Sequence, residues 1–88
     1  MDIQIARVTH FYDKVHVAVI EIISQPLSVG DTIRIRGAIT DFVQVVTMLQ
    51  VENNQVTIVE AGETCALRVE SPVEIGDMIY LQSKKQHI

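Results

Sequence analysis

A triplet made of an aliphatic residue, a glycine and an acidic residue occurs three times in this chain of 88 residues. The copies are VGD at 29–31, AGE at 61–63 and IGD at 75–77, and each directly precedes a run that favours a β-strand. Glycine adopts positive φ without steric cost, and the neighbouring carboxylate can accept backbone amide bonds that a turn leaves unpaired. We therefore predict three structural turns, built by Gly30 with Asp31, Gly62 with Glu63, and Gly76 with Asp77. A metal-binding role is disfavoured, because the stretches DTIRIR and DMIYLQ supply no further oxygen ligands.

The rest of the chain is predicted to form mainly β-strands. The apolar share of 48% comes largely from Val and Ile, which suit a pleated sheet. Strands are predicted at 3–10, 15–23, 32–37, 42–51, 64–69 and 78–82. The first two form a hairpin, a change of phase near Arg7 indicates a bulge, and residues 55–60 fit either a strand or a tight helical turn.

Three similar corners among six strands predict a sheet that bends sharply and closes on itself, since closure removes exposed strand edges. The predicted fold is all-β: a small six-stranded closed antiparallel barrel. It forms one domain over residues 1–83, followed by a flexible tail at 84–88. A domain of this size leaves little room for a deep catalytic cavity.

The composition of the chain indicates its cellular compartment and the classes of partner that it can bind. The N-terminus lacks a basic segment followed by an apolar run, no apolar stretch approaches the ~20 residues that cross a bilayer, and the lone Cys65 fits a buried apolar role in a reducing compartment. We expect a cytoplasmic protein with no membrane partner. Residues 37–83 hold one basic and seven acidic side chains, which disfavours a wide nucleic-acid groove but leaves a local contact by the first half open.

The order VGDTIRIRG, a polar turn, VQVVTML, AGETCALRV and IGDMIYL resembles the second domain of translational GTPases such as elongation factor Tu. The chain is more similar still to small elongation-factor-like proteins and to the C-terminal barrel of the collagenase-like peptidase family. That similarity is carried by VTHFYDK and by Gly37, Thr40, Asp41 and Phe42, and the resemblance extends from about Ile5 to Leu81. It implies a six-stranded closed barrel that associates with RNA or the translation machinery.

The chain lacks two features of the elongation factor. In that family a strand with a Met has an acidic residue just before the Met and a basic residue two after it, where it helps to hold the aminoacyl end of transfer RNA. Both charges are absent around Met48 here, where the sequence reads VTMLQ. There is also no phosphate-loop motif, so GTP is not an expected ligand.

No catalytic or cofactor site is predicted. No Ser or Cys has a recognisable base partner, and no pair of carboxylates is fixed by spacing. His10, Asp13 and His16 could approach one another across the first hairpin, but three ligands on one short turn are a weak metal signal. One His capping a turn and the other on a strand face is the favoured interpretation.

Two groups of side chains could bind a partner. Aromatic residues and donors gather in THFYDK, where a base could stack and a lysine meet a phosphate, and two arginines share one strand face. The candidate binding residues are His10, Tyr12, Lys14, Arg34, Arg36, Thr40, Asp41 and Phe42. The alternatives are that Phe11 plugs a barrel end and that cross-strand carboxylates such as Glu21 pair with the arginines.

The sequence therefore predicts a non-catalytic binding module. Its main predicted partner is RNA or a ribosome-associated factor. The alternatives are an assembly module that docks on a separately encoded peptidase-like or RNA-modifying enzyme, and a barrel that self-associates through an apolar strand face.

Overall fold

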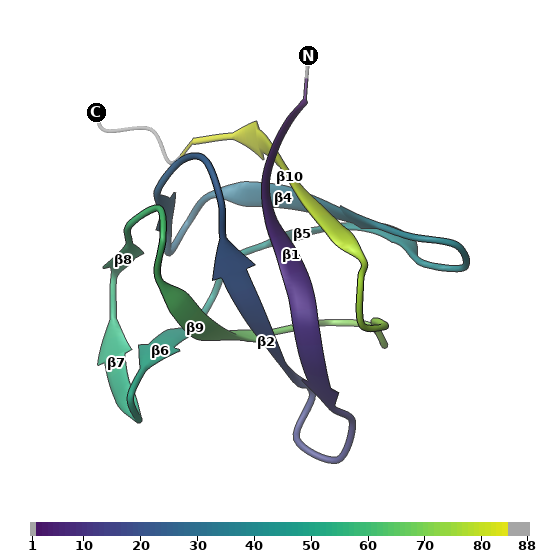
Figure 1. The fold of residues 1–88 in the computed structure, drawn as a ribbon, viewed down its shortest axis with the longest axis horizontal. Coiled ribbons are helices and arrows are strands. Elements are labelled where there is room, and N and C mark those ends of the chain that lie inside the picture. The colour runs from purple at the N-terminus through teal and green to yellow at the C-terminus, as the bar shows by residue number, and fades with distance from the viewer. Residues whose placement is uncertain (1, 85–88) are drawn as a thin grey trace.

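The computed structural model describes residues 2–84, and in this range the chain forms ten β-strands and no helix (Figure 1). The strands are β1 (Ile3–Tyr12), β2 (Val17–Ile22), β3 (Leu27–Ser28), β4 (Thr32–Arg36), β5 (Asp41–Val45), β6 (Leu49–Val51), β7 (Asn54–Val56), β8 (Ile58–Val59), β9 (Thr64–Arg68) and β10 (Met78–Ser83). The all-β prediction is confirmed. No helix in the part of the chain that the structure describes is long and apolar enough to span a membrane.

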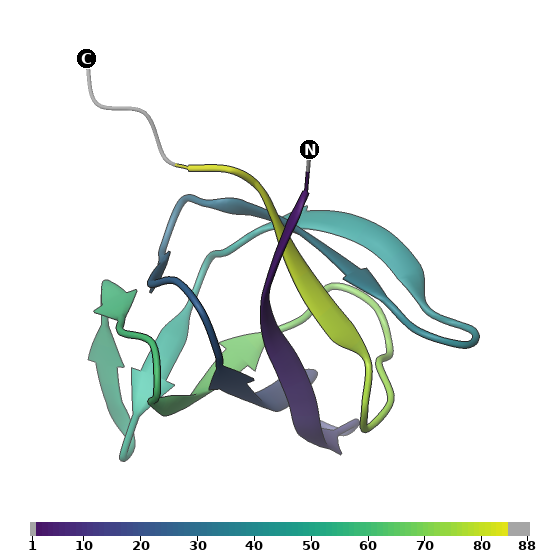
Figure 2. The same cartoon turned by 45° about the horizontal axis from the view of Figure 1, so that its top comes forward.

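The prediction of a six-stranded closed barrel is wrong. Eight strands form one curved antiparallel sheet in the order β5-β4-β10-β1-β2-β9-β6-β7, and β3 pairs with β8 in a separate two-stranded sheet. Strands β5 and β7 end the order of the large sheet, and no strand among residues 2–84 joins them. The sheet therefore curls around a core without closing (Figures 1 and 2).

The strand predicted at 42–51 is divided because its two halves have different partners. Strand β5 pairs with β4, whereas β6 pairs with β9 and β7. Between them Val46 leaves the ladder and binds the first glycine turn instead. The ambiguous stretch at 55–60 is extended rather than helical, and it too changes partner, from β6 to β3, around Thr57.

The hairpin of β1 and β2 is confirmed. Its antiparallel register runs from Ala6 opposite Ile22 to Tyr12 opposite Val17. In place of one bulge near Arg7, β1 has two register shifts, one between Gln4 and Ala6 against β10 and one between Val8 and His10 against β2. These shifts let one long strand bend while it pairs on both sides.

The three aliphatic-glycine-acidic triplets form three turns of the same construction. The glycines Gly30, Gly62 and Gly76 have φ of 98°, 92° and 94°, and the acidic residue donates its N–H to the carbonyl three residues earlier. This geometry matches a type II turn, whose third residue needs positive φ. A carboxylate oxygen of the acidic residue accepts the N–H of that same earlier residue: Asp31 from Ser28 at 2.9 Å, Glu63 from Glu60 at 2.8 Å and Asp77 from Glu74 at 2.8 Å.

Each turn also holds one buried β-branched residue from a distant segment. The glycine N–H donates to that residue's carbonyl, and the carbonyl of the acidic residue accepts its N–H, at 2.8–2.9 Å throughout. The residues held in this way are Val46 at the first turn, Ile22 at the second and Val8 at the third. All three side chains are buried in the core, so the turns position the interior as well as reversing the chain.

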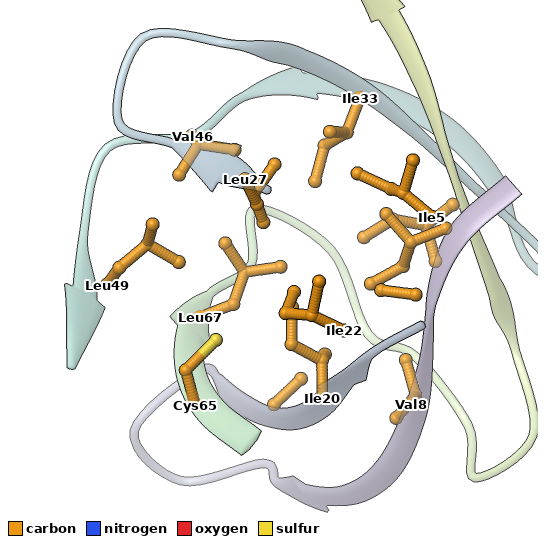
Figure 3. Close-up of a cluster of buried hydrophobic side chains, with 14 of the residues drawn as sticks. Ile5, Val8, Ile20, Ile22, Leu27, Ile33, Val46, Leu49, Cys65 and Leu67 are labelled. Atoms are coloured by element: carbon orange, nitrogen blue, oxygen red, sulfur yellow. The ribbon is translucent and has the colours of Figure 1, made fainter. Parts of the chain in front are cut away.

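The core is one cluster of aliphatic side chains supplied by both sheets, which surround it on several sides (Figure 3). It includes Ile5 and Val8 from β1, Ile20 and Ile22 from β2, and Leu67 from β9. Cys65 lies in the same cluster and is 4% exposed. Lys84, which the sequence assigned to the tail, donates through Nζ to the Pro26 carbonyl and to the buried Asp31 carboxylate; residues 85–88 lie outside the described range.

We predict that Asp77→Ala destabilises the fold more than Glu63→Ala. Both changes remove the carboxylate that accepts a turn N–H, but Asp77 is buried and Glu63 is exposed, so water can replace only the second. Leaving a buried donor unpaired costs about 1–3 kcal/mol. Urea unfolding of the two variants measures the difference, and equal losses would contradict the role assigned to Asp77.

We also predict that the Cys65 thiol is unreactive in the folded protein. Burial, with a smaller contribution from the Glu63 carboxylate, raises the pKa of Cys65 from 9.0 to about 12. A shift of this size makes the thiolate about a thousandfold scarcer at pH 8. Iodoacetamide should label the native protein at least that much more slowly than the urea-unfolded protein.

The same pKa shift sets a direction for alkaline stability. As the pH rises above 9.0, the thiol ionises in the unfolded state while the folded state keeps it protonated up to about 12. The free energy of unfolding should therefore fall between these values. Cys65→Ala removes this part of the pH dependence, and an unchanged alkaline profile in that variant would contradict it.

Candidate docking surface

The hairpin of β4 and β5 carries most of the predicted binding residues and projects from one side of the molecule (Figure 2). Its turn is closed by a bond from the Gly37 N–H to the Thr40 carbonyl at 2.8 Å. Ile33 and Ile35 of β4 face the core, and the two arginines share the other face, as predicted. The hairpin therefore presents a charged outer surface on a well-anchored strand.

Arg34 is committed to a partner within the hairpin. Its Nε and Nη2 donate to the two carboxylate oxygens of Asp41, both at 2.8 Å. This bidentate pair lowers the pKa of the Asp41 carboxyl, chiefly through the side-chain hydrogen bond, and raises the pKa of Arg34 for the same reason. Arg36 is exposed, and its side chain makes no hydrogen bond or close ion pair with any residue from 2 to 84.

The partner suggested for the arginines by the sequence, Glu21, is wrong. Glu21 accepts from Arg7 at 3.0 Å across β1 and β2. The expectation assumed that β4 lies next to β2, but β10 and β1 separate them in the sheet. The carboxylate that neutralises Arg34 comes from β5, the other strand of its own hairpin.

Gly37 is required by a close approach rather than by its φ. A side-chain carbon at this position would overlap Oδ1 of Asp77. That carboxylate cannot easily move, because its Oδ2 holds the Glu74 N–H and the side chain is buried. The start of the hairpin turn is thus packed directly onto the third glycine turn.

A groove of about 390 Å³ lies beside this hairpin. One wall is residues 39–42, from the turn and the start of β5, and the other is residues 71–74, from the segment that leads into β10. Thr40, Asp41 and Phe42, which the sequence singled out, all line it. Figures 1 and 2 show the two segments, far apart in sequence, on the same side of the molecule.

Sequence reasoning missed the residue that closes one end of the gap beside β5. The side-chain amide of Gln44 donates to the Arg68 carbonyl and accepts the Glu70 N–H, both at 2.9 Å. It thereby replaces the two backbone bonds that a neighbouring strand would have made. The signal was present, because Gln44 has the same strand parity as Phe42 and Val46 and is 3% exposed.

The other predicted residues lie elsewhere. His10, Tyr12 and Lys14 belong to β1 and the turn after it, apart from the β4–β5 hairpin (Figures 1 and 2). The rings of His10 and Tyr12 are in contact, with centroids 4.4 Å apart. Across residues 2–84 the structure brings together no three His, Cys, Asp or Glu side chains that could hold a metal.

Known proteins resemble this chain in sequence and in fold. No family model matches the chain. It is 41% identical over 80 residues to an uncharacterised protease of Methanocaldococcus jannaschii, which covers 90% of this chain but only 19% of that protein. The chain thus spans about a fifth of the length of the curated relative that it matches.

Solved structures agree on the fold. The C-terminal domain of a protein assigned to the U32 peptidases of Geobacillus thermoleovorans superposes with a TM-score of 0.84 at 17% identity, covering 91% of this chain and 92% of that domain. Its selenomethionine variant gives 0.82 at 18% identity, covering 88% and 96%. The expected likeness to the C-terminal barrel of collagenase-like peptidases therefore holds for the fold. Neither of these two proteins is described as a translational GTPase, so the likeness to elongation factor Tu is not shown.

We predict that Gln44→Leu opens the side of the molecule next to β5. The change keeps the volume but leaves the Arg68 carbonyl and the Glu70 N–H without their partner, at a cost of about 1–3 kcal/mol. Urea unfolding and hydrogen exchange at the Glu70 amide test this. Gln55→Leu, at an exposed position in β7, is the matched control, and slow exchange at Glu70 in the first variant would contradict the bridging role.

Proposed function

We propose that this chain is a non-catalytic docking module for the catalytic part of a U32-like peptidase. The observation that carries the proposal is the match to a fifth of a much larger protease, at 41% identity. The fold likeness to a domain that forms the C-terminal end of a U32 peptidase supports it. The proposal holds whether that catalytic part is a separate polypeptide or a further part of the same one.

The chemistry of the described residues favours binding over catalysis. The lone cysteine is buried and its pKa is raised to about 12, so it is a poor nucleophile. The groove beside β5 is lined by one serine, Ser71, but by no histidine that could act as its base, and of its two carboxylates Asp41 is already held by Arg34. Its apolar lining residues, Ile39, Phe42, Pro72 and Val73, offer a surface that a partner can cover.

Association with RNA is the rival proposal, but the charged side chains of the β4–β5 hairpin and its groove disfavour it. Arg34 is neutralised by Asp41, and the groove next to it is lined by carboxylates that repel phosphate. Arg36 is the remaining cation of the hairpin. A phosphate backbone binds strongly only where several cations release counterions together.

The test uses the M. jannaschii protease from which the 80 matched residues have been removed. We expect the 88-residue chain to bind this truncated protease in a 1:1 complex, measured by sedimentation and calorimetry. Because docking rests mainly on apolar surface, affinity should fall far less steeply between 50 and 300 mM salt than the affinity of a protein that binds a phosphate backbone. Failure to associate at tens of micromolar would overturn the proposal.

Labelled bulk transfer RNA, titrated in parallel, separates the rival. Binding that weakens steeply with salt and is lost in Arg36→Glu would replace docking with RNA association. Arg36 is the better position for this control, because Arg34→Glu would also place two carboxylates together and damage the hairpin.

A further inference from the structure

The groove beside β5 coincides with the open end of the sheet. Strand β5 pairs with β4 on one side only, and its second edge meets no strand within residues 2–84. The Gln44 amide bridges this edge to residues 68–70, and the groove begins beyond the bridge, between residues 39–42 and 71–74. An unpaired strand edge and a groove next to it are the two parts of a site for an extended peptide.

The side chains that line the groove indicate that such a peptide needs a large apolar side chain. Phe42, Pro72 and the buried Val73 make an apolar surface, and Ile39 stands at the hairpin tip with 79% of its surface exposed. A volume of about 390 Å³ has room for one large apolar side chain with its neighbours. Because Ile39 lies beside Phe42, Pro72 and Val73, it extends one continuous apolar surface that a partner can cover.

The groove carries two carboxylates, and one of them is not paired with another side chain. Asp41 is paired with Arg34, but the Glu74 carboxylate makes no hydrogen bond or ion pair with any described residue. Only the backbone of Glu74 is engaged, by Asp77, which accepts the Glu74 N–H and donates its own N–H to the Glu74 carbonyl. Glu70 lies nearby in sequence, beyond the Gln44 bridge, and residues 37–83 carry seven acidic side chains against one basic.

We propose that this groove receives an extended segment of the partner polypeptide, adding to the edge of β5, with one large apolar side chain seated between Ile39 and Val73 and an adjacent Arg or Lys paired with Glu74. This inference rests on the proposed docking function and names the part of the partner that is recognised. A second copy of this chain is disfavoured as occupant by its net charge of −4, and RNA by the carboxylates.

The first experiment tests the groove without the protease. Isotope-labelled protein is titrated with an eight-residue peptide that has a central Phe flanked by Arg, and with two matched peptides in which Glu replaces Arg or Ala replaces Phe. We expect amide shifts at Ile39, Thr40, Phe42, Val73 and Glu74 with the first peptide, and at least about tenfold weaker binding of the other two. Shifts elsewhere, or equal shifts with the Glu peptide, would overturn the inference.

The second experiment asks whether docking of the truncated protease uses the groove. Ile39→Asn and Glu74→Lys should each weaken binding by about tenfold, the second mainly at low salt. The controls are Val15→Asn, at an exposed apolar residue in the turn between β1 and β2, and Glu60→Lys. Glu60 occupies the same position in the second turn that Glu74 occupies in the third. Both controls should bind as the unchanged protein does.

The outcomes separate the two proposals. Binding of the truncated protease that is unaffected by Ile39→Asn and Glu74→Lys keeps the docking function and rejects the groove. Peptide shifts in the groove without protease binding keep the groove and reject that partner. A doubled mass by light scattering, abolished by Ile39→Asn, would assign the groove to a second copy of the chain instead.

Discussion

The fold depends on one repeated interaction, in which a glycine turn takes both the N–H and the C=O of a single buried residue. Val8, Ile22 and Val46 are held in this way, each by a different turn. Such residues lie where the chain leaves a regular ladder, so their backbone groups would otherwise be buried without partners. The turns satisfy these groups while the side chains enter the core. Sharp bends therefore become compatible with a dry interior in a chain of this size.

The sheet can stay open for a similar reason, because backbone groups that lack a neighbouring strand bind another part of the chain. A closed barrel pairs every strand edge with another strand, but here the interval beside β5 is bridged at one end by the Gln44 amide, a side chain acting as a backbone surrogate. The other end remains as a groove between residues 39–42 and 71–74. The opening is thus built into the fold, and it places apolar side chains and the Glu74 carboxylate at the surface beside the Arg34–Asp41 pair of the hairpin.

Much of the fold could be predicted from sequence because its signals are local. Alternating Ile and Val marked the strands, and the glycine triplets marked the turns. Partner choice could not be predicted in this way, because β-pairing is decided by which distant strands meet. That is why the stretch 42–51 was expected to be one strand, why Glu21 was assigned to the wrong arginine, and why closure was expected. At the candidate site, the sequence singled out Thr40, Asp41 and Phe42, which line the groove, whereas Gln44 and Glu74 gain their positions there only from the segments packed against them.

The three turns differ in how much chain each must close. The first joins residues 30 and 46, the second 62 and 22, and the third 76 and 8, spans of 16, 40 and 68 residues. For flexible chains the entropic cost of closure grows with the logarithm of the span, so the third loop costs about 1.3 kcal/mol more than the first. The first turn is thus the one that a growing chain can form earliest, and the third, which fastens the beginning of the chain to the approach of its final strand, is the last to be secured. The number of residues between each triplet and its partner therefore favours one order of assembly.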